Sequence, residues 1–459
     1  MKELAVYNNI EFMKRCLIFV IFMMFCIAPA FAYELILPKE KKTFTNNKYA
    51  FFVGRAENNE SIMINDEKIY TASNGAFAYS VELNEGENRI AVKSNYGMKI
   101  YKIYKNSPQE KVEPPLEESS PVLYVVLKDN TPLRSTPVDY GMNRMSHLFE
   151  GTKLIVNGKK GNFYRVFLSK DKIGWIDKDA VQKFDGENII SEFLTVNSKT
   201  YKNASEHTIE FTEKLPYTID ETKGEIFFKV YNPFVSEDSV YTIIARKPDK
   251  YAYKTISSNG VYVFKVSALP CVEKVLEGIN IFVDAGHGGT ELGAIGCLGD
   301  KEKDINLKIA NELKEALLLM GANVYMSREC DGFVSLDDRV NMAKNNCVDI
   351  FVSIHLNSIP DIKMDIHKNR GTSVYYYNPN SKDLASAVLR SVTKGIKTRN
   401  DGLRTASFAV IRPTEYLGIL VETAYMTNPL DSLMYTDEEF PRETARAIAE
   451  GILNYVKSK

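Results

Sequence analysis

The sequence predicts a chain of several domains, in which all-β modules precede a C-terminal three-layer α/β domain. The 459 residues exceed the ~150 that one domain usually takes. Residues 33–270 alternate apolar and polar side chains between frequent turns, which is typical of β-strands. From residue 271 to residue 459, short apolar runs alternate with long helical patterns. That alternation is the βα signature of an α/β domain.

Composition fits an ordinary globular protein. Hydrophobic residues make up 44% of the chain and charged residues 25%, so most of the chain can bury cores. The formal net charge is −1, which gives no general attraction to nucleic acid or to acidic membranes. We therefore expect no nucleic-acid partner.

Residues 1–32 have the pattern of a secretory signal peptide. The basic pair Lys14-Arg15 precedes an apolar run, and the sequence AFA at 30–32 supplies a small-x-small cleavage site. The run is short for a bilayer span. We expect a secreted protein of the extracellular space, cell wall or periplasm, with no stable membrane anchor after cleavage. The alternative is an uncleaved N-terminal anchor, and Met13 is an alternative start.

Four cysteines remain after removal of this leader: Cys271, Cys297, Cys330 and Cys347. No two have CxxC spacing, so the sequence indicates no structural zinc knuckle. Export permits disulfides, and buried free thiols are the alternative.

Residues 33–105 contain the strand-like runs AFFVGRA, SIMIND, FAYSVEL and NRIAVKS, which predict a small β-sandwich. They resemble immunoglobulin-like modules of bacterial surface proteins. Residues 106–121 are rich in proline and glutamate, so we expect an extended linker.

Residues 122–185 resemble the bacterial SH3 domain, with LRSTP, YRV and GWI in the expected order. The resemblance implies a module able to bind the cell wall. Trp175, the single tryptophan, would either stack on a wall ligand or pack in the core of a small barrel. Residues 186–270 are a third β-rich segment of unassigned type.

The C-terminal domain is expected to open with a strand at 280–284, a glycine-rich loop and a helix at 304–320. Asp304 is the expected N-cap of that helix and Gly321 its stop. Ser335 and Asp338 have the spacing of a capping box for the next helix. The remaining expected elements are strands at NVYMS, 349–355, 372–377 and 418–422 and helices at 382–397 and 438–456.

His287, Glu302 and His355 are candidate metal ligands. The two histidines each follow an apolar, strand-like run, and the ends of such strands are where α/β sheets place their sites. Glu302 stands at a helix entrance beside flexible glycines. Two imidazoles and one carboxylate are a ligand set for catalytic zinc, which keeps a position for water. The alternative is a chance collection of residues at loops and strand ends.

The motifs around these residues resemble the zinc-dependent N-acetylmuramoyl-L-alanine amidases of the Amidase_3 family. VDAGHGG, KEKDINLKIANEL, LDDRVNMAKN, DIFVSIHLNS and GILVETAYMTN occur in the family's order over residues 279–457. The resemblance implies a phosphorylase/hydrolase-like domain that holds Zn²⁺ through His287, Glu302 and His355, with Glu422 as the catalytic residue. It also implies a substrate, peptidoglycan, cut between the lactyl group of muramic acid and the L-alanine of the stem peptide.

Glu422 ends an apolar run, where a carboxylate could accept the proton of water and pass it to the leaving amine. A solvated strand-end carboxylate is the alternative. Asp284 and Arg339 match family positions and are expected to orient the structure. Asn357 is expected at the substrate rim or behind the ligands, whereas His367 is not expected to bind metal.

The chain departs from the family pattern at Ala285, Leu417 and Ala424, and none of these changes removes a chemical group. A long insert after the second histidine motif is absent, so we expect no self-inhibiting helix at 359–370. Two other functions stay open. One is a non-catalytic wall-binding scaffold that retains the amidase fold, and the other is a zinc peptidase that cuts within the stem peptide.

Overall fold

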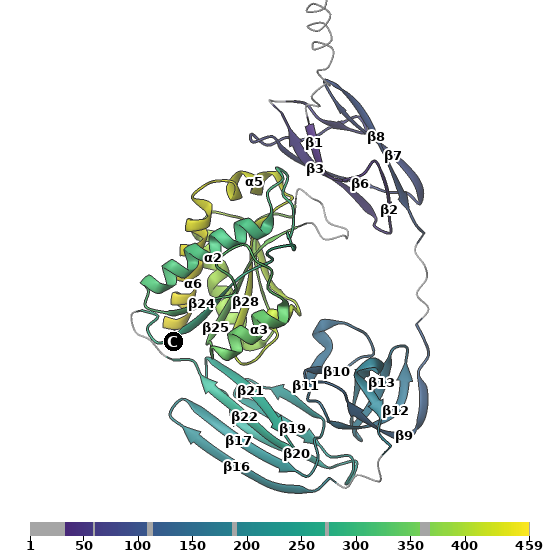
Figure 1. Cartoon of the computed structure of the whole chain (residues 1–459), viewed down its shortest axis with the longest axis vertical. Helices are drawn as coiled ribbons and strands as arrows, with labels where there is room; N and C mark the ends of the chain where they lie inside the picture. The colour runs from purple at the N-terminus through teal and green to yellow at the C-terminus, as the bar shows by residue number, and fades with distance from the viewer. Residues whose placement is uncertain are drawn as a thin grey trace, which may run out of the picture.

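The computed structural model describes residues 33–57, 60–107, 113–185, 191–270, 275–358 and 368–458 (Figure 1). The predicted leader, Cys271 and His367 lie outside the described residues. The all-β character predicted for the region before the C-terminal domain is confirmed. No helix among the described residues is long and apolar enough to cross a membrane.

The first module consists of two sheets that enclose one core. Phe52 and Phe77 from the smaller sheet meet Ile90 and Tyr101 from the larger one, and all four side chains are buried. The smaller sheet has the order β1 (Tyr33–Leu37), β3 (Tyr49–Ala56) and β6 (Ala76–Glu82). The larger has the order β2 (Lys42–Thr45), β8 (Gly97–Lys105), β7 (Gly86–Ser94), β4 (Met63–Ile64) and β5 (Glu67–Lys68).

The second module is a seven-stranded sheet. Its first strand begins at Glu117, inside the stretch predicted as linker, so that prediction is wrong for 117–121. Glu117 pairs with Lys159 on the adjacent strand at 2.9 Å, and Glu118 pairs with Arg165, which lies one strand further into the sheet, at 3.0 Å. The sheet order is β11 (Arg144–Leu148), β10 (Thr131–Arg134), β14 (Lys172–Asp177), β13 (Phe163–Ser169), β12 (Lys153–Lys160), β9 (Glu117–Val126) and β15 (Val181–Lys183).

The third module shares a core with the second. One buried cluster joins Leu133 and Val166 of the second module to Phe211 and Tyr262 of the third. Trp175 is only 6% exposed, so it packs and offers no open ring face to a ligand. The third module has two sheets, β16 (Phe193–Tyr201), β17 (Ala204–Phe211), β22 (Val261–Ala268), β21 (Tyr251–Ser258) and β18 (Tyr217–Glu221), β19 (Glu225–Tyr231), β20 (Val240–Arg246).

The C-terminal domain is built on one six-stranded sheet with helices on both faces (Figure 1). Its order is β24 (Asn323–Met326), β23 (Asn280–Ala285), β25 (Ile350–Asn357), β28 (Leu417–Tyr425), β26 (Thr372–Tyr376) and β27 (Asn400–Thr405). The first four are parallel, and β26 is antiparallel to β28. Long helices α2 (Glu302–Leu319), α4 (Lys382–Gly395) and α6 (Phe440–Lys457) share the core of one face, and α3 (Leu336–Asn345) contributes to the other.

The start of α2 differs from the prediction. The helix begins at Glu302 with Lys301 as N-cap, and no side chain caps it, so the assignment of Asp304 as the cap is wrong. The physical reason lies in the preceding loop, whose Ala294 carbonyl already accepts the main-chain N–H of Glu302 at 2.9 Å. Asp304 lies in the first turn, where its charge favours the positive end of the helix.

Other helix boundaries follow their sequence signals. Ser335 caps α3, and its Oγ accepts the N–H of Asp338 at 3.1 Å. Gly321 follows α2 with a φ of 88°, a conformation that glycine adopts without strain. The strand β27 and the short helix α5 (Pro429–Tyr435) have no counterpart among the expected elements.

The β modules contact the C-terminal sheet at opposite ends of its strands. Tyr253 of the third module donates its N–H to the carbonyl of Thr414 at 2.8 Å, just before β28 begins. Asn74 of the first module donates to Ser432 Oγ at 3.0 Å, in α5, just after β28 ends. The first module therefore lies at the carboxyl edge of the parallel strands, and the other two at the amino edge.

Candidate metal centre

The three predicted ligands come together at the carboxyl edge of the sheet. His287 follows β23, His355 lies near the end of β25, and Glu302 is the first residue of α2. One donor atom from each of the three side chains lies within 4.8 Å of the other two. Parallel neighbouring strands bring their ends together in this way, which is how residues far apart in sequence converge.

The carboxylate of Glu302 lies between the two imidazoles. His287 Nε2 is 3.2 Å from one of its oxygens and His355 Nδ1 is 2.9 Å from the other. The main-chain N–H groups of Ala294 and Leu356 donate to the same carboxylate at 2.7 and 3.2 Å. The carboxylate is therefore held from several directions.

Two glycines make room for this arrangement. Gly293 has a φ of 68°, and a Cβ there would lie 2.5 Å from Glu302 Oε2 and 2.7 Å from the His287 ring. A Cβ at Gly286 would lie 2.4 Å from the ring of His355. A side chain at either position would displace a candidate ligand.

A buried ion pair anchors the loop that carries His287. Arg339 pairs with Asp284, and both side chains are buried. The same guanidinium donates to the carbonyl of Ala285 at 2.7 Å and to that of His287 at 2.8 Å. Asp284 also accepts from Ser353 Oγ at 2.6 Å. These contacts orient the structure around the site, as the sequence predicts for Asp284 and Arg339.

Glu422 lies beside the candidate ligands. In the register of β25 and β28 it is the direct partner of His355. Its Oε2 atom is buried and has no hydrogen-bond partner among the described residues. Burial raises the pKa of Glu422 to about 8; His355 and Arg404 act against this rise and Glu302 adds to it.

The ligand side chains influence one another's protonation. Burial by itself would raise the pKa of Glu302, but hydrogen bonds from His287 and His355 lower it. Burial would lower the pKa of His355, but its hydrogen bond to Glu302 raises it. A carboxylate between two imidazoles is a donor set that suits zinc. The unpartnered oxygen of Glu422 supplies an acceptor next to it, so these residues fit a catalytic zinc ion.

Arg404 is a residue near the site that the sequence pattern does not predict. It lies on β27, where its positive charge acts to lower the pKa of Glu422, and it donates to Asp401 Oδ2 at 2.6 Å. Tyr425 donates to the same carboxylate oxygen at 2.8 Å. The strand that carries Arg404, NDGLRT, is polar and contains a glycine, so it gives no strand signal. Asn357 is located near the site, at the end of β25, where its side chain accepts the N–H of Ser358 at 2.9 Å.

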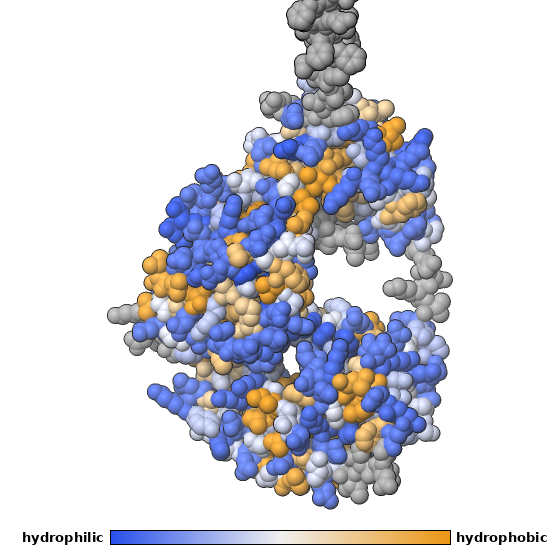
Figure 2. All heavy atoms as spheres, in the orientation of Figure 1, coloured by the Kyte–Doolittle hydropathy of each residue, from blue (hydrophilic) through white to orange (hydrophobic). Residues whose placement is uncertain are grey.

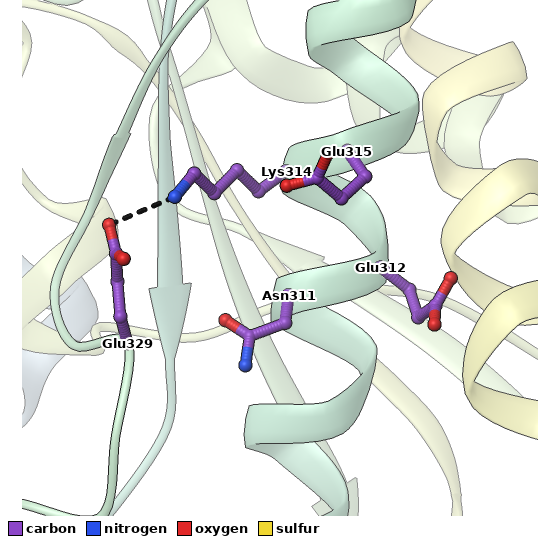
Figure 3. Close-up of a pocket in the computed structure, with 5 residues that line it drawn as sticks. All are labelled: Asn311, Glu312, Lys314, Glu315 and Glu329. Atoms are coloured by element: carbon purple, nitrogen blue, oxygen red, sulfur yellow. Dashed lines mark hydrogen bonds and ion pairs between the residues drawn. The ribbon is translucent and has the colours of Figure 1, made fainter.

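A depression on the outside of α2 is separate from this centre. Figure 3 shows Asn311, Glu312, Lys314 and Glu315 from the helix opposite Glu329, with Lys314 and Glu329 paired at 3.0 Å. None of these residues is a candidate ligand. An exposed ion pair such as Lys314 and Glu329 adds little to the stability of the fold.

Comparison with known proteins identifies the C-terminal domain. Residues 281–454 match the Amidase_3 family, described as N-acetylmuramoyl-L-alanine amidase. The chain is 36% identical to YqiI of Bacillus subtilis over 192 residues, which cover 40% of this chain and 90% of YqiI. It is also 36% identical to the N-acetylmuramoyl-L-alanine amidase LytC of Bacillus subtilis over 184 residues, 39% of this chain but only 36% of LytC.

Among solved structures, the N-acetylmuramoyl-L-alanine amidase AmiC2 of Nostoc punctiforme matches 40% of this chain and 99% of its own, with 36% identity and a TM-score of 0.38. The sequence matches define a class of cell wall hydrolases. This chain belongs to that class as a member of the Amidase_3 family of N-acetylmuramoyl-L-alanine amidases, through its C-terminal domain.

Proposed function

We propose that this protein is a secreted, zinc-dependent N-acetylmuramoyl-L-alanine amidase. Its substrate would be peptidoglycan, and the bond cut would be the amide between the lactyl group of muramic acid and the L-alanine of the stem peptide. The observation that carries the proposal is the convergence of His287, Glu302 and His355 beside Glu422. Membership of the amidase family supports the choice of substrate.

In this proposal the three ligands hold the ion and Glu422 moves the proton. When bound, zinc would lower the pKa of a water molecule and polarise the amide carbonyl. Glu422, whose Oε2 atom has no other partner among the described residues, would accept the proton of the attacking water in its ionised form, which the positive charge of a bound ion would favour. It then passes the proton to the leaving amine of L-alanine, because an amine leaves readily only when protonated.

The remaining assignments belong to the same proposal. The C-terminal domain is a three-layer, phosphorylase/hydrolase-like α/β domain of residues 271–459. Residues 33–105 form an immunoglobulin-like module, and residues 122–185 a bacterial SH3-like module that binds the wall. Residues 1–32 direct the protein to the extracellular space, the cell wall or the periplasm.

Digestion of purified sacculi tests the proposal. The full chain loaded with zinc should release stem peptides with a free N-terminal L-alanine, detected by mass analysis of the products. Fragments cut within the stem would indicate a peptidase. Binding to sacculi without any release, by a chain that contains zinc, would indicate a non-catalytic scaffold.

A further inference from the structure

The smaller sheet of the first module is buried on both faces. Phe52 and Phe77 point into the core of the module. Val53, Ala76 and Ala78 alternate with them along β3 and β6, so they point to the opposite face. These three side chains are nevertheless 0% exposed. Something outside the module therefore covers this second face.

The covering segment is the loop that joins the proposed ligands His287 and Glu302. Cys297, in the middle of that loop, is 0% exposed and belongs to the same buried cluster as Val53 and Ala78, with Leu298 packed beside it. Figure 2 shows hydrophobic atoms where the module meets the C-terminal domain. Burial raises the pKa of the Cys297 thiol to about 12, as a thiol closed off from water requires.

A hydrogen bond beside this apolar contact fixes its orientation. The turn before β6 is shaped by Asn74, whose Oδ1 accepts the N–H of Ala76 at 3.2 Å. The Nδ2 of Asn74 donates to Ser432 Oγ in α5 at 3.0 Å, and Ser432 donates in turn to the carbonyl of Pro429 at 2.8 Å. The module thus contacts the loop and the helix that follows β28.

Cys297 is only three residues along the chain from Ala294, which is hydrogen-bonded to Glu302. The N–H of Cys297 donates to the carbonyl of Met426 at 3.3 Å. Ala294, three residues earlier, accepts the N–H of Glu302 at 2.9 Å and donates its own N–H to the carboxylate at 2.7 Å. A shift of Cys297 would therefore move Ala294, and with it the carboxylate between the two imidazoles.

We propose that residues 33–105 hold in place the loop that joins His287 and Glu302, called here the metal loop. Metal affinity then depends on the packing of Cys297 and Leu298 against β3 and β6. This inference rests on the metal site of the proposed function. The module is a positioning element that acts through Glu302. It differs from a tethered wall-binding module, because the outer face of β3 and β6 packs against the C-terminal domain.

The test uses the full chain with Ala78→Arg, which puts a charge into the buried junction and leaves the inward-facing Phe77 unchanged. Met98→Arg is the matched control, since Met98 lies in the same module and is 55% exposed. Two quantities are measured. One is the rate at which N-ethylmaleimide modifies Cys297, located by peptide mass mapping, and the other is zinc affinity by chelator competition.

Ala78→Arg should speed the modification of Cys297 and weaken zinc binding, each by about tenfold or more, while Met98→Arg changes neither. Circular dichroism checks that the variant folds, and Ala78→Gln replaces it if it does not. Faster modification with unchanged zinc affinity would overturn the inference and leave the proposed function intact. Continued protection of Cys297 in a folded Ala78→Arg chain would also overturn it.

A wild-type chain that binds no zinc would overturn the proposed function and this inference with it. The labelling of Cys297 needs no metal, so it separates that failure from a failure of the module to seat on the loop.

Discussion

His355 and Glu422 stand directly opposite each other on the parallel strands β25 and β28. A candidate ligand and a candidate proton carrier are thus fixed relative to each other by main-chain hydrogen bonds of the sheet centre. A strand pair in the middle of a sheet is among the most rigid settings that a fold offers. The site therefore depends on few flexible segments for the relation between these two side chains.

Replacing Glu422 by Gln should keep the metal and abolish turnover. The amide has nearly the same shape but cannot accept and return a proton, so we expect a loss of ~10²-fold or more in kcat. Rates on sacculi and zinc content are measured together. Glu312→Gln, a surface change on α2, is the control, and near-normal rates for Glu422→Gln would reject the assigned role.

Replacing His355 by Ala should remove the metal. The change deletes one of three protein donors, and zinc sites with fewer donors bind far more weakly. Zinc per chain after dialysis is the measurement. His207→Ala removes a half-buried histidine on β17 and should leave the zinc content unchanged. Full zinc occupancy in His355→Ala would mean that the ligand set is different.

Breaking the pair of Asp284 and Arg339 should cost stability as well as activity. Arg339→Met leaves a buried carboxylate without its partner, which we expect to lower the free energy of unfolding by about 3–5 kcal/mol. Denaturant titration gives the value. Lys314→Met removes a surface pair with Glu329 and should cost less than ~1 kcal/mol. Equal losses for the two variants would contradict the anchoring role.

The raised pKa of Glu422 predicts a pH-dependent stability of the metal-free chain. Between the ordinary value of 4.5 and about 8, the unfolded chain loses this proton while the folded chain keeps it. Stability should therefore fall as pH rises through this window, by at most ~1.4 kcal/mol per pH unit, and level off above it.

The same titration of Glu422→Gln isolates the effect, because His355 and Glu302 remain in both chains. The gap between the variant and the wild type, measured by denaturant in the presence of a chelator, should widen from pH 5 to pH 8. A constant gap would show that Glu422 ionises normally in the folded protein.

Much of the site and of the sheet is predictable from the sequence. His287 and His355 end apolar runs, and the family motifs around them also indicate Glu302 and Glu422. The long helices with regular apolar spacing are likewise predictable, because burial of one face dominates their energetics. The helix start at Glu302 is not predictable from the sequence. The main-chain bond from the N–H of Glu302 to the carbonyl of Ala294, eight residues earlier, outweighs the local capping signal at Asp304.

The contact between the first module and the metal loop cannot be predicted from separate segments. The sequence does indicate that β3 is buried on both faces, because its run YAFFVG is apolar on both faces. Such runs are typical of strands buried on both sides, but the pattern does not say which partner covers the outer face. Only the fold places Cys297 there. Arg404 could not be predicted for a different reason. The edge strand that carries it is polar and lacks the alternation of apolar and polar residues that indicates a strand.

The two-sided burial of this sheet affects how the chain folds during synthesis. The ribosome makes the first module long before Cys297 and Leu298 exist, so Val53, Ala76 and Ala78 remain open to water until the last domain is complete. Nascent chains with such exposed apolar surface are prone to aggregate and to recruit chaperones. The order of the domains thus makes completion of the C-terminal domain the event that ends this vulnerability.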